Sequence, residues 1–161
     1  MKKFYLDMTE SNNCISAFMK DAEIIQAGTT IYSMSVSARN AEYQKLAKEY
    51  DVHFIFDDMD VKVDFYTIPR IDIMAIDSKG GYIATVGMMS DLDSDASICY
   101  IDKNKRTYII AENAREFIAN IAEWKENLRA YNEIHFFQTQ KQAQTMYEFI
   151  DVGVFVSENE S

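Results

Sequence analysis

A pair of glycines between two β-prone runs constrains the fold more than any other part of the sequence. Residues 71–76 read Ile-Asp-Ile-Met-Ala-Ile, 77–81 read Asp-Ser-Lys-Gly-Gly, and 82–87 read Tyr-Ile-Ala-Thr-Val-Gly. β-branched and aromatic residues favour strands, and glycine allows the positive φ angles that tight hairpin turns require. We therefore predict an antiparallel hairpin at 71–87, with Gly80 and Gly81 both supplying positive φ.

Other strands and helices are predicted on both sides of this hairpin. Short β-prone runs typical of strands occur at 52–56, 61–66, 98–101 and 107–110. Apolar residues recur at helical spacing in 37–50, 113–131 and 143–150. Asn113 is expected to cap its helix, with Glu116 completing a capping box. Residues 1–35 stay ambiguous between strand and helix. The pattern predicts an α+β fold with a curved, mostly antiparallel sheet flanked by helices.

The chain length and composition favour a single domain. A chain of 161 residues buries roughly 70% of its unfolded surface, so the core needs no disulfide or metal. We predict one domain over 1–156 and a frayed polar tail at 157–161. We expect no secretory leader and no membrane span, and a cytoplasmic location. Cys14 and Cys99 lack partner spacing and are expected to be free thiols, although a single bridge between them stays possible.

Negative charge is concentrated in the middle of the chain. The formal net charge is -10, and all ten acidic residues of 57–102 are aspartates. Nucleic-acid binding relies on clustered Lys and Arg, so this balance argues against a direct nucleic-acid ligand. It favours a basic protein partner. Because Asp prefers turns and strand ends to helix interiors, we expect these charges at the rims of the sheet.

The candidate site residues come from this acidic segment. The predicted partner-binding residues are Asp57, Asp58, Asp60, Asp64, Asp91, Asp93, Asp95 and Tyr82. The first four aspartates could form an anionic patch, or a solvated strand edge that is charged to prevent edge-to-edge pairing. Tyr82, if exposed, would suit the centre of an interface.

No pattern in the sequence predicts a metal, a cofactor or a catalytic centre. Asp91, Asp93, Asp95 and Asp102 echo a calcium loop, but Ala96 replaces the glycine of its sharp turn and Asp102 replaces the bidentate Glu. Neither histidine has metal-ligand spacing, and the glycine pair leads into a strand instead of a helix N-terminus. With no nucleophile motif either, we expect a protein that is not an enzyme.

Three segments in order carry a resemblance to a known family. They are Ile-Met-Ala-Ile-Asp-Ser-Lys-Gly-Gly-Tyr-Ile at 73–83, Ser-Ile-Cys-Tyr-Ile-Asp at 97–102, and Ile-Ala-Glu-Asn-Ala-Arg-Glu-Phe-Ile at 110–118. A strand ending in an acidic residue, a glycine turn, a return strand, a further strand and a helix in this order resemble the SMI1/KNR4 (SUKH) superfamily. The resemblance covers 65–121, about a third of the chain. The opening helix segment and Asn-Gly-Gly typical of members do not occur before Pro69.

The resemblance implies an SMI1/KNR4-like α+β domain and two possible functions. Bacterial members are commonly cytosolic immunity proteins of polymorphic toxin systems, which bind and inhibit a toxin domain, often a nuclease. A nuclease presents Lys and Arg to phosphates, so an acidic inhibitor would be steered to that surface. The alternative is a scaffold or regulatory interaction domain with no toxin partner, as implied by fungal members.

Overall fold

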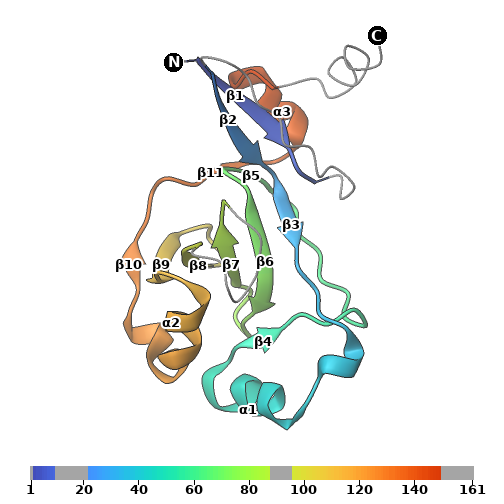
Figure 1. Cartoon of the computed structure of the whole chain (residues 1–161), viewed down its shortest axis with the longest axis vertical. Coiled ribbons are helices and arrows are strands. Elements are labelled where there is room, and N and C mark those ends of the chain that lie inside the picture. The colour runs from blue at the N-terminus through green and yellow to red at the C-terminus, as the bar shows by residue number, and fades with distance from the viewer. Residues whose placement is uncertain (1, 10–21, 88–95, 150–161) are drawn as a thin grey trace.

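The computed structural model of the chain describes residues 2–9, 22–87 and 96–149, and its centre is a seven-stranded mixed sheet (Figure 1). The strands are β3 (Thr29–Ile31), β4 (His53–Phe54), β6 (Ile71–Ile76), β7 (Tyr82–Val86), β8 (Ile98–Ile101), β9 (Thr107–Ala111) and β10 (Arg129–Ala130). Their order is β10-β9-β8-β7-β6-β3, and β4 also pairs with β6. All neighbours are antiparallel except β3 and β6, which are parallel.

Two small sheets lie at one end of the large one. In the first, β1 (Lys2–Asp7) pairs in parallel with β2 (Ala22–Ala27), and in the second, β5 (Tyr66–Ile68) pairs antiparallel with β11 (His135–Phe137). The fold is therefore α+β, as predicted, with two parallel pairs within the mostly antiparallel arrangement.

Three α-helices and two 3₁₀ helices accompany these sheets in the described ranges. They are η1 (Val36–Ala38), α1 (Ala41–Tyr50), α2 (Ala114–Ala119), η2 (Ile121–Glu126) and α3 (Gln140–Met146). Asn40, Asn113 and Thr139 cap the three α-helices through their side-chain oxygens. No helix in the described part of the chain is long and apolar enough to cross a membrane.

The predicted hairpin is confirmed, but one of its glycines has a different role from the one expected. The strands pair from Ile71↔Val86 to Ile76↔Tyr82, and Gly80 has the expected positive φ of 84°. Gly81 does not have a positive φ. A Cβ at Gly81 would collide with the ring and hydroxyl of Tyr100, so close packing excludes a side chain there.

The long helix predicted at 113–131 is wrong. Asn113 does cap α2, but the α-helix ends at Ala119, and the chain continues as η2 and then as β10. Ile118 and Leu128, expected on the buried stripe, are 45% and 40% exposed. Short 3₁₀ turns are common at helix ends, and here the tighter winding still buries Ile121 and Trp124.

The other predicted helices and the predicted strand at 61–66 need smaller corrections. The helix predicted at 37–50 begins only at Ala41, and the one predicted at 143–150 spans Gln140–Met146. Residues 59–65 form no strand, although their side chains alternate between half-buried and exposed as a strand would. Regular hydrogen bonding begins only at β5. The alternation shows that every second side chain of 61–65 contacts the apolar face of the sheet. An irregular segment can make such contacts as well as a strand can.

Both faces of the large sheet are buried, and different kinds of structure cover them. On one face, α2 and η2 pack over β7, β8 and β9 through residues such as Phe117 and Trp124. On the other face, irregular chain around Phe65 and Ile134 covers Ile71, Ile73 and Cys99. Burial on both faces explains why β8 reads as an unbroken apolar run.

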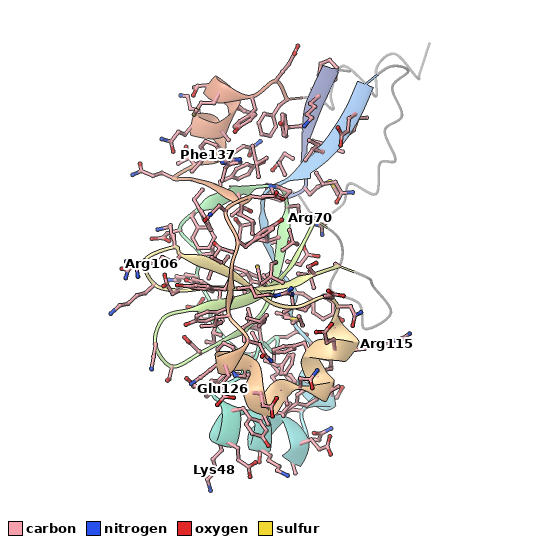
Figure 2. All side chains as sticks on the ribbon, turned by 90° about the vertical axis from the view of Figure 1, so that its left-hand side faces the viewer. Lys48, Arg70, Arg106, Arg115, Glu126 and Phe137 are labelled. Atoms are coloured by element: carbon pink, nitrogen blue, oxygen red, sulfur yellow. The ribbon has the colours of Figure 1, made fainter. Side chains whose placement is uncertain are left out.

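A third, separate apolar cluster holds the end of the molecule that carries the small sheets. It contains Ala27, Tyr66, Ile68, Phe137 and Ala143, which come from β2, β5, β11 and α3. Phe137 therefore lies at the opposite end of the molecule from Lys48 and Glu126 (Figure 2).

Candidate partner-binding surface

The first four candidate aspartates lie on one irregular segment, residues 57–64, which we call the acidic loop. The chain enters it from the buried Phe56 and leaves it at the buried Phe65. Between these anchors, Val61 and Val63 pack against the sheet while the aspartates are exposed. The apolar residues therefore fix the loop, and the carboxylates face solvent.

Two of the four carboxylates are held by neighbouring segments. The Ser33 hydroxyl donates to Asp57, and the Arg39 guanidinium donates to both oxygens of Asp58, at 3.1 and 2.5 Å. The hydrogen bonds from Arg39 lower the pKa of the Asp58 carboxyl. Asp60 lies 3.9 Å from the ammonium group of Lys62, and both side chains are more than 80% exposed. The loop therefore stays negative, but cations partly compensate two of its charges.

Tyr82, on β7, lies against the acidic loop. The Tyr82 hydroxyl donates to the main-chain oxygen of Lys62 at 3.3 Å, and its ring packs edge-on against Phe65. Burial raises the pKa of Tyr82, and the nearby charge of Asp64 adds to this. Tyr82 is half-buried, so it supports the loop from β7 and exposes only part of its ring.

An exposed apolar strip, which the sequence reasoning missed, lies beside the acidic loop. Six large hydrophobic residues are exposed in the described ranges, and three of them, Ile31, Tyr32 and Val36, fall within 31–36. The bond from Ser33 to Asp57 and a parallel bridge from Met34 to Phe56 join this segment to the start of the loop. Figure 1 shows the two segments running side by side below β3. We call residues 31–36 the apolar strip.

The structure places only some of the other residues that the sequence analysis singled out. Asp91, Asp93 and Asp95, and with them most of the calcium-loop pattern, lie outside the described residues. Asp102 accepts from the amides of Asn104 and Arg106, at 2.9 Å each, and thereby closes its own turn. Cys99 is fully buried, which raises the pKa of its thiol to about 12. Cys14 lies outside the described residues.

A second polar cluster, centred on Asp51, was not predicted. Asp51 ends α1 in the left-handed conformation and accepts hydrogen bonds from the Ser78 amide and hydroxyl and from His53 Nε2 at 2.9 Å. Lys125 Nζ lies 3.6 Å away. Burial opposes ionisation, but these donors prevail and lower the pKa of Asp51 to about 2. One carboxylate thus joins α1, β4, the hairpin turn and η2.

The order of contacts in this cluster differs from that of a nucleophilic triad. In a triad the histidine lies between the hydroxyl and the carboxylate, so that it can take the hydroxyl proton. Here Asp51 lies between Ser78 and His53 and accepts from both. Within the described ranges no group of three or more His, Cys, Asp or Glu side chains could hold a metal ion.

With the surface described, the chain can be compared with known proteins. No protein-family model, curated protein or solved structure matches it. The acidic loop and the apolar strip are therefore the features of this chain that point to a function.

Proposed function

We propose that the protein is a non-enzymatic, cytoplasmic immunity protein that binds and neutralises a cognate toxin domain through the acidic loop. The observation that supports this most is the position of the loop beside the apolar strip. Protein interfaces combine exposed aromatic and aliphatic side chains, which contribute most of the binding energy, with a polar rim that sets orientation. Tyr32 and Ile31 would form the centre of such an interface, and Asp57 and Asp58 its rim.

The charge of the loop favours a basic partner of the nuclease type. A domain that binds nucleic acid presents Lys and Arg, and opposite charge speeds the encounter of two proteins. The mechanism would be steric and electrostatic block of the toxin surface, with no chemical step. The SMI1/KNR4-like resemblance of 65–121 agrees with this function, but the acidic loop and the apolar strip lie outside that range and only Tyr82 lies within it.

Co-expression with the toxin domain tests the proposal. The chain would be produced together with the C-terminal domain encoded by its neighbouring upstream gene, and survival and co-purification would be scored. Rescue with a stable complex is the expected result. Continued killing without a complex, when both proteins are soluble, would contradict the proposal and favour the alternative, a scaffold or regulatory interaction domain with no toxin partner.

A further inference from the structure

The edge strand β3 and the residues that follow it carry no charge over eight positions. The segment 29–36, which contains β3 and the apolar strip, reads Thr-Thr-Ile-Tyr-Ser-Met-Ser-Val. It has no charged residue, no proline and no glycine. Ile31 at the end of β3, Tyr32 directly after it and Val36 at the start of η1 are each at least 40% exposed.

The main chain of this edge has hydrogen-bonding groups that face away from the sheet. Ile71 donates to Gly28, and Tyr32 donates to Ile73, so the even-numbered residues of β3 face β6. Successive groups of a strand alternate in direction, which turns the amides of Ile31 and Ser33 outward. Among the described residues, β3 is the last strand of the sheet on this side.

An exposed, uncharged edge is a liability that folded proteins usually avoid. Natural edges are protected by charged side chains, proline, bulges or a covering segment, because a bare edge pairs with other chains. The segment 29–36 has neither a charged side chain nor a proline, and its protection is limited to the shortness of β3, which spans three residues. The carboxylates of the acidic loop lie beside this segment. An edge of this kind suits a protein that pairs with a strand when it binds its partner.

We propose that this edge binds an extended, basic strand of the partner protein by strand addition. Main-chain hydrogen bonds would form with Ile31 and Ser33, and apolar side chains of the strand would cover Ile31 and Tyr32. Lys or Arg side chains on the strand would meet Asp57 and Asp58. Opposite charge selects this occupant over a second copy of the chain, whose own acidic loop would be repelled. The inference rests on the proposed function, since it specifies how the basic partner is held.

Amide hydrogen exchange with a model strand tests the inference. The probe is a nine-residue peptide of alternating Lys and Val, added to the full chain and followed by NMR. We expect the amides of Ile31 and Ser33 to exchange fast in the free protein and at least tenfold more slowly with saturating peptide. Two control peptides should bind at least tenfold more weakly. In one, Glu replaces Lys, which reverses the charge; in the other, the Lys peptide is N-methylated on the main-chain amides along one of its edges, which removes those hydrogen-bond donors.

A pair of variants at one position tests the same contact from the protein side. Ser33→Pro removes the outward amide, which the sheet does not use, whereas Ser33→Ala removes only the hydroxyl. Ser33→Ala also loses the hydroxyl bond to Asp57 and so measures that contribution by itself. The proline variant should bind the peptide at least tenfold more weakly than the alanine variant, and equal affinities of the two would contradict a role of the outward amide. If the Tm of Ser33→Pro shows that this variant does not fold, the comparison of the N-methylated and unmethylated peptides tests strand addition instead.

Several outcomes would overturn the inference. Slow exchange of the Ile31 and Ser33 amides in the free protein would show that the edge is already covered. Sedimentation would then show whether a second copy of the chain covers it, in a dimer, or another segment of the same chain, in a monomer. Equal binding of the N-methylated peptide would exclude strand addition. If the peptide fails to bind but the co-expressed toxin is still neutralised, the edge assignment is wrong and the proposed function stands. If the peptide binds but no toxin is neutralised, the proposed function is wrong instead.

Discussion

At the scale of single residues, Asp51 makes contacts that hold four elements together. Its carboxylate accepts from Ser78 and His53 and lies near Lys125, while its main chain ends α1. The sequence shows only an Asp after a helix, so the cluster could not be predicted. It depends on the pairing of β4 with β6, which brings the hairpin turn beside the helix end.

Replacing this carboxylate should reduce stability in a pH-dependent way. Asp51→Asn should lower the free energy of unfolding at pH 7 by about 1–2 kcal/mol, because charged hydrogen bonds are lost at a partly exposed site. The folded pKa of about 2 lies below the ordinary 3.8, so the carboxylate stabilises the fold above about pH 4. That contribution disappears as the pH falls from about 4 to about 2. Urea denaturation of both proteins across this range would show the difference shrinking.

The matched control is Glu49→Gln, which removes a charge from an exposed position on α1. It should change the unfolding free energy by less than about 0.5 kcal/mol at every pH. A pH-independent difference for Asp51→Asn, or an equal effect of the control, would contradict the role given to the cluster.

Cys99 should be inert in the folded protein. Its thiol is fully buried, and burial raises its pKa to about 12. At pH 8 a reagent therefore cannot reach the sulfur, and the sulfur is not ionised to the reactive thiolate. In a Cys14→Ser variant, labelling by a thiol reagent should follow the global unfolding equilibrium as denaturant is added. Fast labelling without denaturant would disprove the burial of β8.

At the scale of elements, patterns that depend on neighbouring residues could be predicted, and those that depend on tertiary packing could not. The hairpin at 71–87, β8 and β9 follow from local turn chemistry and β-branched runs, and they are where the sequence places them. The helix at 113–131 is broken because the chain turns to place β10 against β9. The strand predicted at 61–66 is irregular chain because Val61, Val63 and Phe65 pack onto the apolar face of the sheet instead of pairing with one of its strands.

Gly81 and Gly87, at the two ends of the return strand β7, should differ in their response to substitution. Gly81→Ala drives a methyl group into Tyr100 and should cost about 2–3 kcal/mol as overpacking. Gly87→Ala is the control. Its φ of +80° strains alanine, but no atom of the described residues lies within 4 Å of the added methyl group, so a cost of about 1–2 kcal/mol is expected. Thermal unfolding would rank the two variants. A smaller effect at Gly81 than at Gly87 would contradict the packing at Tyr100.

At the scale of the whole molecule, the acidic loop and the apolar strip join segments far apart in the sequence. The loop could be predicted from its run of aspartates, and Tyr82 from its place on the return strand. The apolar strip could not, because the segment 29–36 reads equally well as a buried strand. Only its position at the edge of the sheet leaves Ile31 and Tyr32 exposed next to the loop.

The most direct test of this surface is the rate at which the chain associates with its proposed partner, the toxin domain that we expect the neighbouring upstream gene to encode. The rate constant would be measured by stopped flow against salt concentration, for the natural chain and for a variant with Asp57, Asp58, Asp60 and Asp64 all replaced by Asn. A variant with four exposed acids elsewhere replaced, Glu42, Glu49, Glu112 and Glu123, controls for net charge.

If the acidic loop steers the encounter, association of the loop variant should be about tenfold slower at low salt, with a flatter salt dependence than the control. Unchanged affinity and an unchanged salt slope in the loop variant would contradict the assignment of the acidic loop as the partner-binding surface.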